Sequence, residues 1–134
     1  MAKEAGFAFA VSCDDGAAAL QVISNDVTNL QYATPRGVQD VTGVDKSAIE
    51  RLLLLADFSA TLNGVFNDAA NMSHAVLKTV PTTSIQRTLT LAISGQTLSC
   101  ETIATDYSMT RGQDGSLVWT APFVLANGTA PTWS

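Results

Sequence analysis

The sequence predicts a mainly β fold, either a β-sandwich or a partly closed β-barrel, with one flanking α-helix and a long arm between two strands. Stretches in which apolar and polar residues alternate recur along the chain, and turn clusters such as Asp-Asp-Gly and Gly-Gln-Asp-Gly separate them. The arm is predicted because one connection is far longer than a hairpin needs. The 134 residues fit a single domain, with the arm around residues 40–56 and a short C-terminal tail over residues 130–134.

Eight segments carry the strand pattern. They cover residues 6–13, 20–23, 27–34, 37–42, 56–67, 85–93, 97–109 and 117–125. Asp14 and Asp15 lie in the first turn, where solvated acids are expected, and Pro35 ends the third strand. Arg87 stands on the apolar side of its strand, which predicts a solvated strand end. Pro122 removes a backbone donor, so the last strand is predicted to be an edge strand or to be bulged there.

Residues 56–67 give the clearest half-buried strand. Phe58, Ala60, Leu62, Gly64 and Phe66 fall on its apolar face, and Asp57, Ser59, Thr61 and Asn63 fall on its polar face. Asp68 is then expected to cap a helix over residues 69–79, which Pro81 ends. His74, the only histidine, lies on this helix and is expected to pack or to face solvent rather than to act chemically.

The arm carries four consecutive leucines, Leu52, Leu53, Leu54 and Leu55. Ser47 and Glu50 have the spacing of a capping box, whereas the leucine run fits an extended chain equally well. We therefore predict one helical turn followed by extended chain. Four successive leucines cannot all face one side of a strand, so part of this apolar surface is predicted to contact another subunit.

Composition and motifs point away from chemistry. The chain has no Gly-rich phosphate loop, no paired cysteine spacing, no His-Glu-x-x-His helix and no Gly-x-Ser-x-Gly elbow. The sequence therefore predicts no catalytic residue, no cofactor-binding residue and no metal ligand, and the protein is predicted not to be an enzyme. Cys13 and Cys100 are expected to be reduced, buried thiols, because the sequence shows neither an export signal nor a membrane span and predicts folding in a cytoplasm.

The charge distribution excludes tight binding of nucleic acids. Charged residues make up 14% of the chain, against roughly 25% in ordinary soluble domains, and the formal net charge is −5. The seven basic residues are scattered without a run or a stripe, whereas binding to DNA or RNA requires clustered cations.

The order of features resembles that of the major tail tube proteins of long-tailed, siphovirus-type bacteriophages. The resemblance rests on ISNDVTNLQYATPRG, the DVTG turn at residues 40–43, the long arm, ADFSATLNGVFND, the helix segment NMSHAVLKTV and a final tryptophan-bearing strand that closes with LANGT. These segments run from about residue 23 to residue 129. The helix-prone AIERLLLLAD departs from the family pattern, which has a loop or an arm there.

The resemblance implies a structural virion protein that assembles into hexameric rings, which stack into a tube through which the genome is delivered. The arm of each subunit would reach a neighbouring ring, and inner strands would join into a β-lined channel. Implied partners are further copies of the chain and the tape measure, tail terminator and tail tip proteins. DNA would pass through without specific binding, and no membrane partner is implied. The protein would be made in the host cytoplasm and would reside in the virion tail.

The polar face of residues 56–67 is predicted to line the lumen of such a tube, through Asp57, Ser59, Thr61 and Asn63; the strand over residues 27–34 is the alternative. Acids and hydroxyls without cations suit a surface along which DNA moves. Two other classes stay open. One is a head-tail joining protein or the tube protein of type VI secretion, and the other is a small-ligand-binding β-barrel.

Overall fold

The computed structural model describes residues 3 and 5–134, which form eleven strands and one short helix. The strands are β1 (Ala10–Asp14), β2 (Leu20–Val22), β3 (Val27–Ala33), β4 (Arg36–Asp40), β5 (Arg51–Ala56), β6 (Ser59–Val65), β7 (Arg87–Ile93), β8 (Gln96–Ala104), β9 (Ser108–Arg111), β10 (Leu117–Leu125) and β11 (Thr132–Trp133). The helix is α1 (Ser73–Leu77). The predicted fold class, mainly β with one helix and a long arm, is confirmed.

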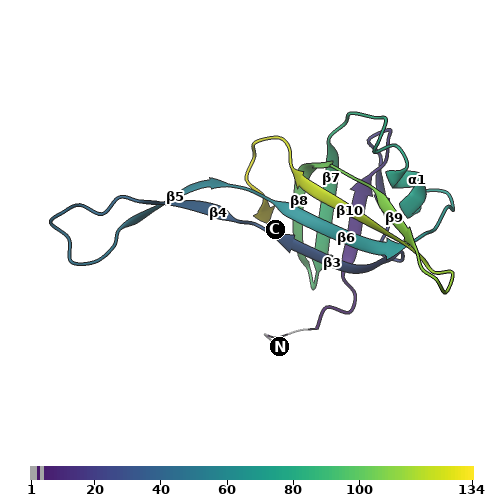
Figure 1. Cartoon of the computed structure of the whole chain (residues 1–134), viewed down its shortest axis with the longest axis horizontal. Helices are drawn as coiled ribbons and strands as arrows, with labels where there is room; N and C mark the ends of the chain where they lie inside the picture. The colour runs from purple at the N-terminus through teal and green to yellow at the C-terminus, as the bar shows by residue number, and fades with distance from the viewer. Residues whose placement is uncertain (1–2, 4) are drawn as a thin grey trace.

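The strands form one large antiparallel sheet and one separate hairpin. In the large sheet the order is β2-β1-β7-β8-β10-β6-β3, with β11 paired to β8 and β9 paired to β10, while β4 and β5 pair only with each other. Figure 1 shows the large sheet curled into a body with α1 at one end, and the β4–β5 hairpin projecting away from it. The curl brings β3 and β6 across from β1 and β7, so that one core lies between them.

The core is filled by alternate residues of nearly every strand of the large sheet. Its fully buried members are Val11, Cys13, Ile23, Phe58, Ala60, Leu62, Val76, Leu77, Leu89, Leu91, Leu98, Trp119, Ala121 and Phe123. The predicted apolar face of residues 56–67 is confirmed at Phe58, Ala60, Leu62 and Gly64. Trp119 is the largest buried side chain, and its indole N–H donates to the carbonyl of Val65 at 2.8 Å. The neighbouring strand therefore satisfies the one polar atom of this ring.

Gly64 makes room for Trp119. A Cβ atom at this position would overlap both the Trp119 ring and the carbonyl of Asp26. We therefore expect Gly64→Ala to lower the free energy of unfolding by roughly 1–3 kcal/mol, as overpacking of a close-packed core does. A thermal melt measures the loss. Gly6→Ala is the matched control, since a Cβ there meets nothing within 4 Å, and an equal loss in both variants would contradict this account.

Arg87 corrects one prediction. It was expected at a solvated strand end, yet it is 1% exposed. Its guanidinium donates to the carbonyls of Asp14 at 2.9 Å and Val76 at 2.8 Å and to the hydroxyl of Thr79 at 2.8 Å. A buried arginine is tolerated because tertiary neighbours supply these acceptors, which no local pattern reveals. Asp14 is also buried rather than solvated, and its carboxylate accepts the N–H of Thr88 at 3.0 Å.

The helix is shorter than predicted. It spans five residues rather than 69–79, and Asp68 does not cap it. Asn71 adopts a positive φ of 63°, which breaks the helical path before α1 begins. The carboxylate of the buried Asp26 accepts the N–H of Ser73 at 2.9 Å instead, so the cap comes from a distant segment of the chain.

Three strand predictions are also corrected. The first strand begins at Ala10 rather than at residue 6, and the segment 97–109 is two strands separated at residues 105–107. Pro122 does not lie in an edge strand, because β6 pairs with β10 from Val118 to Val124. On its other side, β10 pairs with β9 over residues 117–120 and with β8 over residues 123–125. Pro122, which has no backbone N–H, lies between these two stretches.

Candidate functional site

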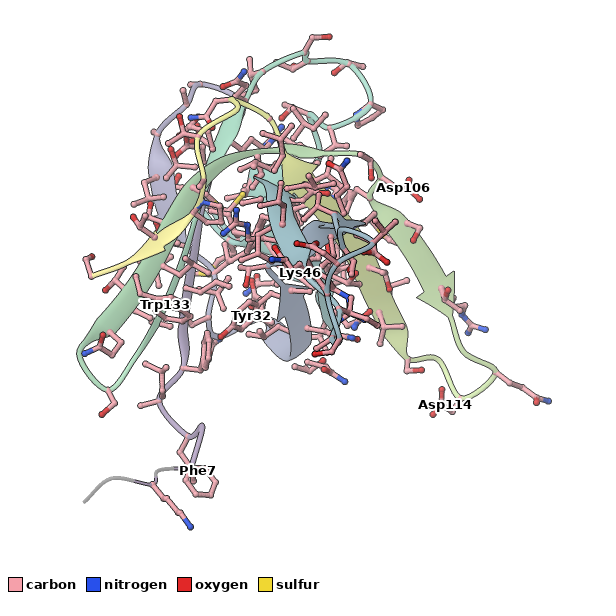
Figure 2. All side chains as sticks on the ribbon, turned by 90° about the vertical axis from the view of Figure 1, so that its left-hand side faces the viewer. Phe7, Tyr32, Lys46, Asp106, Asp114 and Trp133 are labelled. Atoms are coloured by element: carbon pink, nitrogen blue, oxygen red, sulfur yellow. The ribbon has the colours of Figure 1, made fainter. Side chains whose placement is uncertain are left out.

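The arm is an extension of the β3–β6 hairpin. β4 follows β3 after Thr34 and Pro35, β5 leads into β6 through Asp57 and Phe58, and the N–H of Asp57 donates to the carbonyl of Pro35 at 2.9 Å across the junction. Figure 1 shows this hairpin projecting well beyond the body, and Figure 2, which looks along the arm from its tip, shows Lys46 in front of the body. The arm therefore cannot bury its side chains in the core of its own chain.

The predicted helical turn near Ser47 is absent, whereas the extended leucine segment is confirmed as β5. A capping box needs the N–H of Glu50 to reach the side chain of Ser47. Here that N–H donates across the hairpin to the hydroxyl of Thr42 at 2.8 Å, and the carbonyl of Glu50 accepts the N–H of Val41 at 3.0 Å. The backbone N–H and C=O of Glu50 are therefore bonded across the hairpin and are not available for a helical turn.

Polar contacts shape the arm as a hairpin. The guanidinium of Arg36 donates twice to the carbonyl of Leu54, at 3.0 and 2.8 Å, where the β4–β5 register shifts. Near the tip, the carboxylate of Asp40 accepts both the hydroxyl and the N–H of Thr42, and these hydrogen bonds lower the pKa of Asp40. The geometry of the arm is thus defined by contacts within it.

The four leucines of the arm stay exposed, at 44% to 91%. Leu53 lies opposite Val38 on one face of the hairpin, whereas Leu54 covers Gly37 on the other. Both faces are therefore apolar. An apolar strand exposed on both faces is costly in water and favours association, so the arm is the strongest candidate among the described residues for a contact with another chain.

The second feature is a polar face formed by four neighbouring strands, β3, β6, β10 and β9. Ser59, Thr61 and Asn63 point outward from β6, away from the core, while Asp57 is exposed just before this strand. Across the strand pairs they are joined by Asn29 and Gln31 of β3, by Thr120 of β10, and by Ser108 and Thr110 of β9. We call these outward-facing residues the polar face.

The polar face carries no cation. The hydroxyl of Thr120 donates to the amide oxygen of Asn63 at 2.8 Å, which ties two of its strands together. The only basic residue within these four strands is Arg111. It pairs with Leu117, so its side chain points to the core side of the sheet and not to the polar face. Val118 pairs with Val65, Pro122 with Thr61 and Val124 with Ser59, so the face is polar along β3, β6 and β9 but largely apolar along β10.

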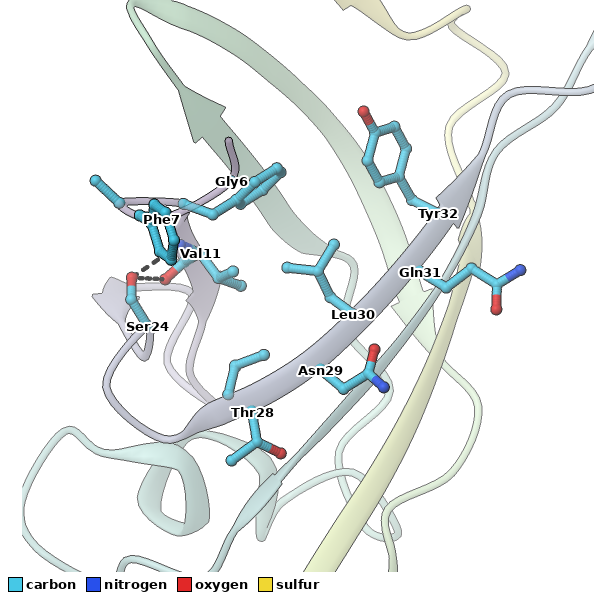
Figure 3. Close-up of a pocket in the computed structure, with 12 residues that line it drawn as sticks. Gly6, Phe7, Val11, Ser24, Thr28, Asn29, Leu30, Gln31 and Tyr32 are labelled. Atoms are coloured by element: carbon cyan, nitrogen blue, oxygen red, sulfur yellow. Dashed lines mark hydrogen bonds between the residues drawn. The ribbon is translucent and has the colours of Figure 1, made fainter. Parts of the chain in front are cut away.

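Both outer edges of the polar face are open. Among the described residues, β3 pairs only with β6, and β9 pairs only with β10. Behind β3 lies a groove of about 680 Å³ between this strand and the N-terminal segment, lined by both apolar and polar residues, and we call it the β3 groove. Figure 3 shows Leu30 and Tyr32 of β3 facing it across from Phe7 and Val11. Sequence reasoning missed this groove, because residues 6–13 were expected to form a complete strand.

The side chains that could take part in catalysis or metal binding, such as His74 and Tyr107, are engaged in packing contacts. The Nδ1 atom of His74 lies 3.2 Å from the Tyr107 hydroxyl, and its ring packs at a tilt of 45° against Phe66, with centroids 4.8 Å apart. Burial raises the pKa of Tyr107 to about 12, so this phenol stays protonated at neutral pH. The described residues contain no group of three or more histidines, cysteines or acids that could hold a metal ion.

Cys13 and Cys100 are free thiols, as predicted. Both lie opposite Leu89, one on β1 and the other on β8, so the strand β7 separates them by about two strand spacings, roughly 10 Å, too far for a disulfide. Burial raises the pKa of Cys13 to about 12 and that of Cys100 to about 11, which lowers the thiolate fraction of both at neutral pH. Within the described part of the chain, no helix reaches the length and apolar character of a membrane span.

Two solved structures share this fold over nearly the whole chain. A chain of the virion of a native gene transfer agent particle has a TM-score of 0.78 at 14% identity, covering 98% of this chain and 99% of that chain. A chain of the tail of an empty gene transfer agent particle, computed with helical refinement and C6 symmetry, has a TM-score of 0.74 at 16% identity, covering 98% and 99%. No protein-family model matches the sequence, and no curated protein matches it.

Proposed function

We propose that this chain is a tail tube protein: a structural, non-enzymatic subunit that assembles into stacked rings and forms the conduit for genome delivery in a phage-like particle. The observation that carries the proposal is the arm, which is apolar on both faces and lies outside the body of the chain. Such an arm has a role only in an assembly. The shared fold supports the same conclusion, because one matched chain belongs to a particle tail solved with C6 symmetry.

The arm and the polar face take separate roles in this proposal. Leu52–Leu55 contact other copies, in the same ring or the next, and six copies form each ring, in keeping with the C6 symmetry of the matched tail. The polar face, including Asp57, Ser59, Thr61 and Asn63, turns toward the lumen. Supporting this orientation, the face holds hydroxyls and amides with no cation to grip phosphates, so DNA would slide along it without specific binding.

The wider setting follows from the same role. The tape measure, tail terminator and tail tip proteins would be the partners at the lumen and at the two ends of the tube. The subunit would be made in the host cytoplasm and would act in the virion tail. DNA would pass through the tube without binding specifically to it.

Electron microscopy of the concentrated, purified chain tests the proposal. We expect tubes about as wide as a phage tail, built from stacked rings, and fast-sedimenting material in the ultracentrifuge. Single rings that never stack would favour a head-tail joining protein. A monomer at every concentration, carrying a bound small molecule in the β3 groove, would overturn the proposal in favour of a ligand-binding barrel.

A further inference from the structure

We propose that Met109 on β9 of one copy docks into the β3 groove of the next copy, so that the two open edges of the polar face lock together through a core-side side chain. This inference rests on the proposed function, because it specifies how neighbouring copies would join within a ring. It adds a contact that neither the arm nor the polar face provides.

Strand direction permits this junction. β3, β6, β10 and β9 are each antiparallel to their neighbours, so β3 and β9 run in opposite directions at the two ends of the face. When identical copies are placed side by side around an axis, β9 of one copy meets β3 of the next as an antiparallel neighbour. The open N–H and C=O groups of both edges can then pair, as they do within each copy.

At this junction, the side chains of β9 and β3 would also alternate in step between the polar face and the core side. On β9, Ser108 and Thr110 belong to the polar face, whereas Met109 lies opposite Trp119 and therefore points to the core side. On β3, Leu30 and Tyr32 point to the core side and into the β3 groove. A second copy of β9 that continues the sheet therefore places its hydroxyls on the polar face and Met109 in the groove.

The groove suits a methionine. Its apolar lining consists of Phe7, Phe9, Val11, Val27, Leu30 and Tyr32, beside polar groups such as Ser24 and Thr28, and Figure 3 shows Leu30 and Tyr32 facing Phe7 across it. Methionine adapts to irregular apolar space and makes favourable sulfur contacts with aromatic rings. Met109 is 40% exposed in the single chain, and Phe7 is 89% exposed, so docking would cover two apolar side chains that the fold leaves in water. Arg111 points to the same side of β9 as Met109. Because it is the last residue of the strand, its guanidinium can stay in solvent.

A cross-linking experiment tests the contact directly in the full-length chain. Phe7→Cys combined with Met109→Cys should give, with a short bismaleimide, a ladder of covalent species from dimer upward. The native cysteines do not compete, because Cys13 is buried, Cys100 is half-buried and both have raised pKa values. Phe7→Cys combined with Thr90→Cys is the control, since Thr90 lies on β7, remote from the polar face, and it should give no ladder. Equal ladders in both, or none in the first, would overturn the proposal.

Three single substitutions give an independent readout. Met109→Asp should reduce the yield of tubes at least tenfold while a thermal melt shows that the chain stays folded, whereas Thr110→Asp, one residue away on the polar face, should leave tubes abundant. Met109→Leu should restore assembly. If Met109→Asp forms tubes as well as the wild type, the docking contact is wrong while the tail tube function stands. If the wild type itself forms no ring or tube, the proposed function fails, and the cross-linking result still decides whether these two edges meet.

Discussion

The double variant Leu53→Ser with Leu54→Ser is expected to remain folded and to form no tubes. The two leucines lie on opposite faces of the arm and are exposed in the single chain, so their loss leaves the core intact. In an assembly, each fully covered leucine would contribute roughly 1.5–3 kcal/mol, less the cost of association and of ordering the arm. Because the substitutions recur in every copy, the loss is multiplied along the tube. A thermal melt and a sedimentation run measure the two effects.

The control for this variant is Leu62→Ser, which removes a leucine of β6 that is fully buried in the core. Truncation of a buried leucine costs roughly 2–5 kcal/mol, a large part of the stability of a domain of this size, so this variant should melt far below the wild type. A low melting temperature for the arm variant as well would show that the arm leucines stabilise the subunit itself. Normal tubes from the arm variant would equally contradict the assembly role.

Lysines on the polar face should block genome delivery without preventing assembly. Ser59→Lys with Thr61→Lys would place two cations per copy among hydroxyls and amides that now hold none. A ring of such cations in a narrow channel would bind phosphates and retard DNA that now passes freely. In a particle carrying the variant, we expect normal tails under the electron microscope and a steep fall in the number of recipient cells that receive DNA.

The matched control places the same charges on the opposite side of the body. Thr90 and Ser99 pair across β7 and β8, with their hydroxyls 3.3 Å apart and exposed to solvent. Thr90→Lys with Ser99→Lys should therefore leave delivery unchanged, since these residues would lie on the outer wall. A loss of delivery in the control alone would mean that the β7–β8 side of the sheet lines the lumen.

The strand β6 was predictable because its alternation depends only on local pattern. Ser59, Thr61 and Asn63 lie outward, and Ala60 and Leu62 lie inward, as the sequence indicates. The helix was overestimated because its start is set by Asp26 and by the positive φ of Asn71, neither of which has a local signature. Periodicity describes the faces of an element better than its ends.

Features that depend on residues distant in the chain could not be predicted from the sequence. Arg87 looked solvated because its acceptors come from Asp14, Val76 and Thr79, and only the fold brings them together. The break at residues 105–107, which creates the separate edge strand β9, is hidden inside one long alternating pattern. As a result, Met109 and the groove behind β3 had no signal beyond ordinary apolar residues. The leucine run, in contrast, was a clear local sign of an exposed arm.

The most direct measurement is a helical reconstruction of tubes assembled from the wild-type chain. The account predicts a sixfold ring in which β3, β6, β10 and β9 of every copy form a continuous inner wall, with Ser59, Thr61 and Asn63 facing the axis and both faces of the arm covered by other copies. A reconstruction with these side chains on the outer surface, or with the leucines of the arm left in solvent, would contradict it.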